Sequence, residues 1–227
     1  MTSDEKTCWT LIRDAAGGDG DARGSFARLY LPVVRAYLGA RWRGGPLLGE
    51  MDDAVQDVFL ECFRDGGALG RARADGPGRF RTFLYAVVRN VARRVEEKRG
   101  RERLRRSPDA PDAEDLSAHE ERLSFVFDRS WAETVLRHAA ERQAETARKK
   151  GPEAIRRIEL MRLRFNEDRP IREIARMWNE DAAVLHHEYA RAREEFKTAL
   201  REEVGFHHSG TPGDIDRECR NLLRFFG

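Results

Sequence analysis

The chain has few cysteines and no long apolar run, and these two absences exclude several classes of protein. Its 227 residues hold three cysteines, Cys8, Cys62 and Cys219, which are far apart and form no C-x-x-C pair. This spacing predicts reduced thiols rather than a disulfide framework or a zinc site, with Cys62 in the core. No apolar stretch approaches the roughly 20 residues that a membrane-spanning helix needs. We therefore expect no membrane partner.

Catalytic and targeting motifs are also missing. The sequence contains no phosphate-cradling G-x-x-x-x-G-K, no H-E-x-x-H and no convincing nucleophile–base pair. The first ten residues, MTSDEKTCWT, are acidic and lack the apolar core of a signal peptide. These observations predict a cytoplasmic protein that is not an enzyme and that takes no cofactor, metal ion or small-molecule substrate.

Positive charge, by contrast, is concentrated in one part of the chain. Charged residues make up 36% of the sequence and the formal net charge is only +2, while 40% hydrophobic residues are enough for packed cores. Between Arg89 and Arg106, nine lysines and arginines stand against three glutamates, a local excess of +6. Such a concentration is typical of phosphate binding. A charge run alone is more often a solvated face, so this block indicates nucleic acid only together with its flanking motifs.

Apolar residues recur at helical spacing throughout, and no segment shows the sustained alternation of a strand. The sequence therefore predicts an all-α protein. In the first half, helices are expected near Trp9, over 22–43 with a kink or restart at Pro32, from Asp52 to Phe63, and from Phe80 onward. In the second half, they are expected over 119–150, 153–165, 170–178 and 182–204.

The segment SPDAPDAEDLSA (107–118) divides the chain, because it combines two prolines and several acids with almost nothing to bury. It predicts an acidic linker between two small helical domains, 1–106 and 119–204. Residues 205–227 are expected to form a tail with one short amphipathic helix. Packing of this tail into a core is favoured over a controlling role on the second domain, because four of its apolar residues need burial: Ile215, Leu222, Leu223 and Phe226.

Two motifs together resemble a known family. DDAVQDVFLECF (52–63) followed by FRTFLYAVVRNVARR (80–94) resembles regions 2.2 to 2.4 of bacterial sigma-70 family factors, in the extracytoplasmic-function group. EIARMW and VLHHEYARAREEF have the pattern of a helix-turn-helix and resemble region 4 of the same proteins. FDRSWAETVLRHAAERQAE (127–145) further resembles a subset common in planctomycete-like bacteria. The resemblance covers roughly 22–204 and is strongest over 51–94.

The resemblance implies a sigma factor, which binds core RNA polymerase, directs it to promoter DNA and helps to open the duplex. Many members of this family are held by an anti-sigma factor, although nothing in the sequence identifies one. The alternative is a helix-turn-helix transcriptional regulator that acts without being a polymerase subunit. The helix at 51–65 discriminates between them, since a repressor or activator has no need of DDAVQDVFL beside an arginine-rich helix.

In similar factors the DDAVQDVFL helix docks on the clamp helices of the polymerase β′ subunit. Exposed carboxylates on such a helix suit a basic partner. For Asp52, capping of the helix N-terminus is an equally good interpretation. The positions that the resemblance assigns to polymerase binding are Asp52, Asp53, Gln56, Asp57, Phe59 and Leu60.

The loop before the long helix, together with the first turns of that helix, captures an unstacked base of the −10 element in similar factors. Stacking of the base on aromatic side chains and hydrogen bonds to its edge can offset the free energy that strand separation costs. Asn90 fits this role because an amide offers both a donor and an acceptor. Phe80 and Leu84 are expected in the core, and core is also the favoured place for Phe83. The implied −10 residues are Arg79, Phe83, Tyr85, Arg89, Asn90, Arg93 and Arg94.

The second helix of the helix-turn-helix is expected to contact the −35 element. It departs from the family pattern, because His186, His187 and Glu188 stand where lysine or arginine is usual. Neutral histidine attracts phosphate weakly, and glutamate repels it unless it accepts from a cytosine amine. Either the contact is weak, or arginines carry it. The implied −35 residues are Arg172, His186, His187, Glu188, Arg191 and Arg193.

Overall fold

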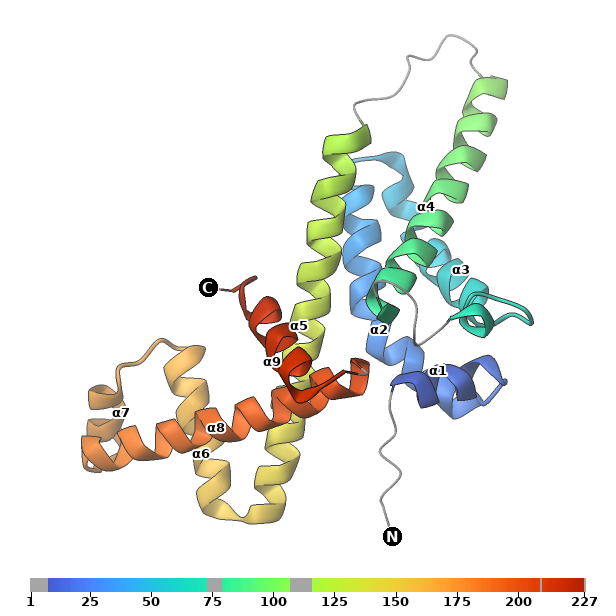
Figure 1. The fold of residues 1–227 in the computed structure, drawn as a ribbon. Coiled ribbons are helices and arrows are strands. Elements are labelled where there is room, and N and C mark those ends of the chain that lie inside the picture. The colour runs from blue at the N-terminus through green and yellow to red at the C-terminus, as the bar shows by residue number, and fades with distance from the viewer. Residues whose placement is uncertain (1–7, 73–78, 107–115, 209, 227) are drawn as a thin grey trace. The chain divides into compact units, whose positions relative to one another are not determined.

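The structure is a computed structural model that describes residues 8–72, 79–106, 116–208 and 210–226, with the side chains of residues 79, 103, 104, 106 and 116–119 left aside. Within these ranges every regular element is a helix, and none is a strand (Figure 1). The predicted all-α class is therefore confirmed. No helix in the described ranges combines the length and the apolar character needed to cross a bilayer.

The chain divides into two compact units, and some helices have residues in both. The first unit comprises residues 1–134, 206–209 and 222–227, and the second comprises 135–205 and 210–221. Helix α5 (Leu116–Lys150) begins in the first unit and ends in the second, whereas α8 (Ala182–His207) ends in the first. Residues 116–118, assigned to the linker from the sequence, form the first turn of α5, and 107–115 lie outside the described residues.

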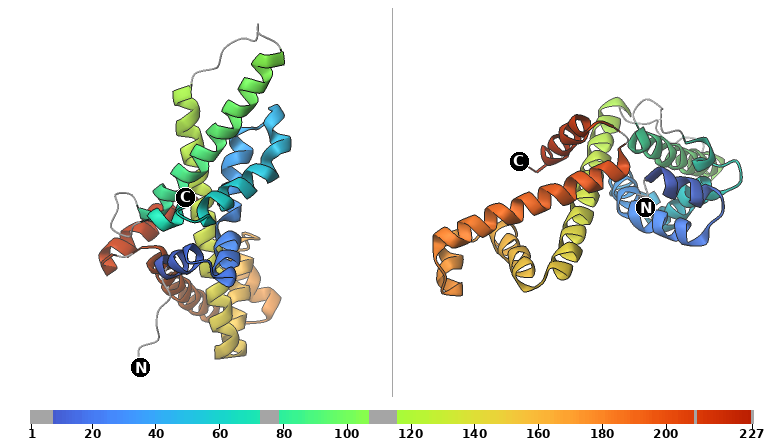
Figure 2. Two further views of the ribbon diagram at one scale, coloured as in Figure 1. Left: turned by 90° about the vertical axis from the view of Figure 1, so that its right-hand side faces the viewer. Right: turned by 60° about the horizontal axis from the view of Figure 1, so that its bottom comes forward.

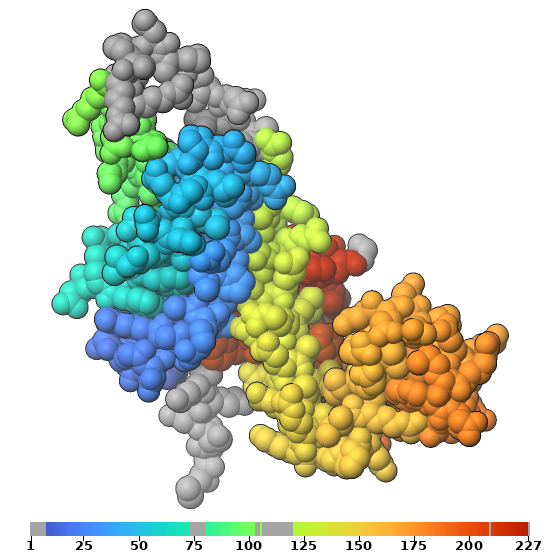
Figure 3. Space-filling view, turned by 180° about the vertical axis from the view of Figure 1, so that it is seen from behind, coloured from blue at the N-terminus to red at the C-terminus, as the bar shows by residue number. Residues whose placement is uncertain are grey.

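Among its described residues, the first unit has four helices before the start of α5, together with two short 3-10 turns. Helix α2 packs against α1, α3 and α4, and α3 also packs against α4 (Figure 2). The elements are α1 (Cys8–Ala16), α2 (Gly20–Arg41), η1 (Pro46–Glu50), α3 (Met51–Phe63), η2 (Leu69–Arg71) and α4 (Arg79–Arg106). In the space-filling view, α3 lies at the surface of this unit (Figure 3).

An aromatic cluster forms the centre of the first unit. The ring of Tyr30 lies 4.7 Å from that of Phe26 and 5.1 Å from that of Phe80, and all three side chains are buried. Tilted and edge-to-face pairs of this kind add to the free energy gained by burying the rings. Leu84 and Cys62 are buried as well, so the core positions predicted for Phe80, Leu84 and Cys62 are confirmed.

Helix α2 is continuous through Pro32, and the restart considered at that residue does not occur. Asp19 caps the N-terminus of this helix, and its side chain accepts from the N–H of Ala22 at 2.7 Å. Proline in a helix interior costs about 3 kcal/mol. Buried side chains on both sides of Pro32, Tyr30 before it and Val33 after it, hold the two halves of the helix in one core.

The second unit contains a helix-turn-helix. The described helices of this unit are the end of α5, α6 (Pro152–Phe165), α7 (Ile171–Trp178), α8 as far as residue 205, and α9 (Pro212–Leu223) apart from its last two residues. Between α7 and α8, Asn179 takes a left-handed conformation with φ of 53°, and the N–H of Glu180 donates to the carbonyl of Ala175 at 2.9 Å. Asparagine tolerates this conformation, so the turn closes without glycine. The residues packed beneath it are Leu160, Leu163, Ile171, Ile174, Ala175 and Leu185.

The C-terminal tail forms α9 as predicted, but only part of its apolar surface is covered. Leu222 is buried, and Ile215 is half-buried. Leu223 and Phe226 are exposed, so the burial expected for these two residues is wrong. Helix α9 is tied to α8 by Arg201, whose guanidinium donates to both carboxylate oxygens of Asp216 at 2.5 and 2.8 Å.

Candidate functional site

One face of α3 is exposed and carries the residues assigned to polymerase docking. Helical spacing turns Val55, Val58 and Cys62 inward, and burial raises the pKa of the Cys62 thiol to about 12. The opposite face presents Leu60, whose large apolar side chain is 57% exposed. Its neighbours on this face are Asp52, Asp53, Gln56 and Asp57, which are exposed, and Phe59, which is half-buried.

Asp52 contacts a neighbouring helix rather than capping its own. Its carboxylate accepts from Nη2 of Arg35, on α2, at 2.6 Å. The N-cap position of α3 is taken by Glu50, whose side chain makes no capping hydrogen bond. Both partners are largely exposed, and pairs of this kind contribute less than about 1 kcal/mol to stability. Asp52 can therefore exchange this contact for one with a partner.

The exposed face of α4 carries an amide and two cations. Phe80, Leu84 and Val88 turn inward, which leaves Asn90 and Arg93 exposed. Arg94 is exposed too, but its Nη2 donates to Oε2 of Glu61, on α3, at 3.0 Å. An amide is able to read the edge of a base, and guanidinium groups beside it are able to bind the adjacent nucleic-acid backbone.

Two other −10 candidates, Tyr85 and Arg89, are held by α5. The hydroxyl of Tyr85 donates to Oε2 of Glu120 at 3.3 Å, and Nε of Arg89 lies 3.1 Å from the same oxygen. The ring of Phe127 lies 5.2 Å from that of Tyr85, roughly perpendicular to it. Tyr85 and Arg89 are consequently half-buried. A strand of DNA could reach their polar groups only in competition with Glu120.

Phe83 and Arg79 complete the −10 set. Phe83 is half-buried, and its ring centre lies 5.9 Å from that of the buried Phe80. Its side chain thus borders the core without being enclosed by it. Arg79 is the first residue of α4, but its side chain lies outside the described residues, as does the basic loop 73–78.

Glu120 belongs to a polar network centred on a buried arginine. The side chain of Arg41 is 5% exposed, and its guanidinium donates to both carboxylate oxygens of Glu96, at 2.6 and 2.9 Å, and to Glu120 at 2.9 Å. Burial opposes the charge of Arg41, but these hydrogen bonds outweigh it and raise its pKa. Burial alone would raise the pKa of Glu120, yet hydrogen bonds from Arg41 and the charge of Arg89 lower it. Burial raises the pKa of Tyr37, which also contacts Arg41, to about 12.

This network was not foreseen from the sequence. Glu120 contacts Arg41 from 79 positions away, and nothing in its local pattern distinguishes it from the adjacent Glu121. Its effect is to place a carboxylate from α5 on the face of α4 that the resemblance assigns to DNA. Sequence reasoning missed Arg41, Glu96 and Glu120 for this reason.

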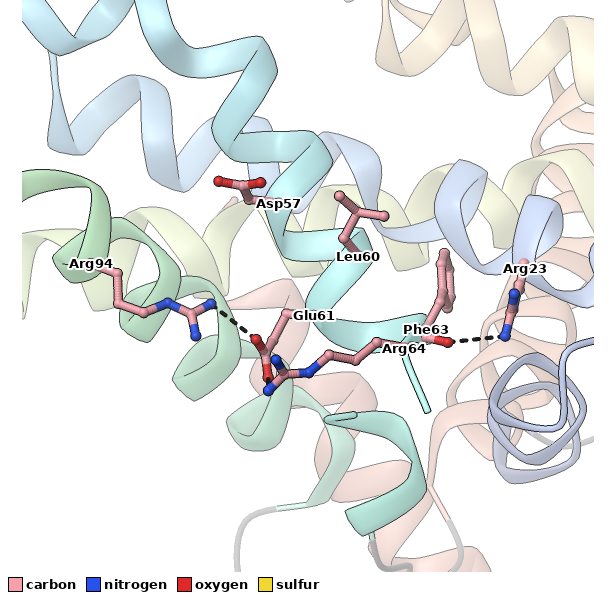
Figure 4. A pocket seen from close by; sticks show the side chains of 7 residues that line it. All are labelled: Arg23, Asp57, Leu60, Glu61, Phe63, Arg64 and Arg94. Carbon is pink, nitrogen blue, oxygen red and sulfur yellow. Dashed lines mark hydrogen bonds and ion pairs between the residues drawn. The ribbon is translucent and has the colours of Figure 1, made fainter. Parts of the chain in front are cut away.

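A groove lies where the docking residues of α3 meet α4, and it has a volume of about 610 Å³. It brings Asp57 and Leu60 together with Arg94, so it joins residues assigned to polymerase with one assigned to DNA (Figure 4). Arg23 forms one side and donates to the carbonyl of Phe63 at 2.9 Å, at the C-terminal end of α3 where a positive charge is favourable. The complete lining is Arg23, Asp57, Leu60, Glu61, Phe63, Arg64 and Arg94.

In the helix-turn-helix, the structure separates Glu188 from the other −35 candidates. Glu188 is half-buried and accepts from Nη1 of Arg157 at 3.1 Å, while Glu195 accepts from Nε and Nη2 of the same arginine at 3.1 and 2.8 Å. Arg157 is 3% exposed, and sequence reasoning missed it. Glu188 is thus tied to an internal ion pair. The candidates that remain exposed are Arg172, His186, His187, Arg191 and Arg193.

No protein-family model matches the chain, and no curated protein is similar to it at a significant level. The functional interpretation therefore depends on the arrangement of its own residues.

Within the described ranges, no group of three or more histidine, cysteine, aspartate or glutamate side chains is arranged to hold a metal ion. The thiol of Cys8 is buried, and burial raises its pKa to about 12, as it does for Cys62. A thiol with so high a pKa is a weak nucleophile at neutral pH.

Proposed function

We propose that the chain is a sigma factor of the sigma-70 family, in the extracytoplasmic-function group, which binds core RNA polymerase and directs promoter recognition and opening. One observation carries the proposal. Two helices packed against each other, α3 and α4, expose different chemistries: carboxylates and an apolar side chain on α3, and an amide with guanidinium groups on α4. Such a pair is able to bind a protein and a nucleic acid at the same time. A factor of this kind acts in the cytoplasm.

The exposed face of α3 has the composition of a protein-binding surface. Leu60 is a large apolar side chain in contact with solvent, and Gln56 and Asp57 flank it along the helix. Protein interfaces commonly place an apolar centre inside a polar rim, and a partner that covers Leu60 gains the free energy of its burial. Under the proposal this partner is the pair of clamp helices of the polymerase β′ subunit.

The exposed face of α4 supplies the contacts to the opened −10 element. Asn90 reads a base edge, and Arg93 contacts the backbone. Tyr85 and Arg89 join them once Glu120 is displaced from the two side chains. In the second unit, the contact to the −35 element is made by Arg172, His186, His187, Arg191 and Arg193, and Glu188 has an internal role through Arg157.

The test is run-off transcription with core polymerase, combined with gel filtration of the mixture. A double variant, Gln56→Ala with Asp57→Ala, should lose co-migration with the polymerase and with it the transcript. Glu133→Ala is the matched control, since Glu133 is an exposed carboxylate of the first unit outside α3. A chain that binds duplex promoter DNA but never co-migrates with polymerase would instead be a helix-turn-helix regulator.

A further inference from the structure

Three arginines from different elements converge on one carboxylate at the end of α3. Oε1 of Glu61 accepts from Nη2 of Arg64 at 2.8 Å and lies 3.7 Å from Nη2 of Arg71. Oε2 of Glu61 accepts from Nη2 of Arg94 at 3.0 Å. Arg64 follows α3, Arg71 ends η2, and Arg94 lies on α4. Figure 4 shows Arg64 and Arg94 pointing toward Glu61 from opposite sides.

A tight turn brings these elements together. The N–H of Ala68 donates to the carbonyl of Glu61 at 2.9 Å, and the N–H of Gly67 donates to that of Arg64 at 2.8 Å. Gly66 has a φ of 63°, which favours glycine, and a Cβ on Gly67 would lie 2.6 Å from the carbonyl oxygen of Arg64. The turn therefore needs glycine at both positions, and it places η2 beside the end of α3.

The cluster carries more positive charge than its own carboxylate neutralises. The side chain of Glu61 is 12% exposed, whereas those of Arg64, Arg71 and Arg94 are 57%, 65% and 56% exposed. Three guanidinium groups and one carboxylate leave an excess of two positive charges. Each guanidinium offers five N–H donors, far more than the acceptor sites of Glu61 can take. The exposed donors are open to an anion from outside.

We propose that this cluster binds a phosphate group of a nucleic-acid backbone between Arg64, Arg71 and Arg94, and that Glu61 is the positioning residue that holds the three arginines together. Arginine suits phosphate because its planar fork donates two parallel hydrogen bonds. The groove beside the cluster has a volume of about 610 Å³ and is open to solvent rather than enclosed. A continuous strand can therefore lie along it.

The row of charges beyond the cluster favours a nucleic acid over an acidic peptide. Lys98, Arg101 and Arg105 are exposed, and they follow Arg94 at intervals of three or four residues along α4. Side chains at this spacing share one face of a helix. The row presents about one cation per helical turn. A nucleic-acid strand carries a phosphate at every nucleotide, so its repeated charges match this row. The inference rests on the nucleic-acid part of the proposed function, and it adds Arg64 and Arg71, which are not among the −10 residues, to a backbone contact that includes Arg94.

The experiment is fluorescence anisotropy of the full chain with a short labelled single strand carrying a −10 sequence, titrated over a range of salt concentrations. The double variant Arg64→Gln with Arg71→Gln should bind about fivefold more weakly near 0.15 M salt, because an exposed charge contact is worth about 1 kcal/mol. Its log–log salt slope should fall by about 0.7, the value for one lost phosphate contact on a single strand. Arg137→Gln is the matched control, since Arg137 is an exposed arginine paired with one glutamate, and its slope should be unchanged.

Two further variants keep the outcomes distinct. Glu61→Gln keeps a side-chain oxygen that can position the arginines but removes the negative charge that competes with phosphate, so binding of the strand should tighten. Arg93→Gln tests the nucleic-acid role separately.

If Arg93→Gln weakens binding while Arg64→Gln with Arg71→Gln leaves affinity and slope unchanged, the phosphate site is wrong and the DNA role stands. If all these variants bind as the unaltered chain does, both are wrong. If the double variant no longer binds core polymerase but still binds the single strand with unchanged affinity, the cluster binds protein. That outcome also overturns the phosphate site.

Discussion

Nε of Arg89 lies 3.1 Å from the carboxylate of Glu120, so a residue that we propose to contact DNA is bound to an acidic side chain of α5. The same carboxylate accepts from Arg41, which is buried and cannot follow a ligand outward. Glu120 is therefore held at this position by the core, while Arg89 is half-buried beside it. Any strand that takes Arg89 must compete with a fixed negative charge.

Replacement of Glu120 by glutamine should strengthen binding of a −10 single strand several-fold. The change removes one negative charge from the face of α4 and weakens the hold on Arg89. Anisotropy titrations at fixed salt would measure the effect. Glu121→Gln makes the same charge change at the next position, and an equal gain in that control would mean that net charge rather than the Arg89 contact is responsible.

Arg41→Met should lower the free energy of unfolding of the first unit by about 3–5 kcal/mol. The substitution leaves Glu96 and Glu120 without the guanidinium that compensates their charge, and breaking a buried pair has an effect of this size. Urea unfolding followed by tryptophan fluorescence would measure this loss of stability. Trp42 is a suitable probe because its Nε1 donates to Glu96, in the same network. Arg35→Met, which breaks only an exposed pair, should cost less than about 1 kcal/mol.

The pH dependence of stability should show the lowered pKa of Glu120. A carboxylate whose pKa is lower in the folded state stabilises the fold above its unfolded pKa, which is about 4.3 for glutamate. That contribution is lost as the pH falls from there through the folded pKa. Denaturant unfolding between about pH 6 and pH 3 should therefore show a shallower decline for Glu120→Gln than for the unaltered chain. Parallel curves would contradict the assigned direction of the shift.

In the second unit, Arg157→Met should destabilise the helix-turn-helix by about 3 kcal/mol. Glu188 and Glu195 would lose the buried partner that holds them, and they would repel each other along α8. Trp178 lies in this unit and gives a local fluorescence signal. Arg164→Met is the control, because its pair with Asp168 is exposed. A loss no larger than that of the control would show that Arg157 does not organise the unit.

Much of the helical framework could be predicted from the sequence, because it depends on short-range spacing. The apolar period placed the ends of α6 and α7 within one residue of those observed, and it placed the start of α8 correctly but ended that helix three residues early. It also placed Phe80 and Leu84 inside and Asn90 outside. Such patterns are decided within one or two turns of the chain, so neighbouring residues carry the information.

Predictions that depended on distant residues were less successful. Local propensity suggested an interruption at Pro32, yet packing on both sides kept the helix continuous. Leu223 and Phe226 were expected to be buried and are exposed. Their apolar character was evident from the sequence, but whether another element covers them was not.

By itself, the sequence determined which residues form helices and which faces of those helices are apolar, because both follow from a period of 3.6 residues. Only the tertiary structure decided which charges meet. It brought Glu120 to Arg89, Arg157 to Glu188 and Arg94 to Glu61, across separations of 31 to 33 residues. An ion pair depends on where packed helices place two side chains in space, and the order of residues along a chain does not specify that position.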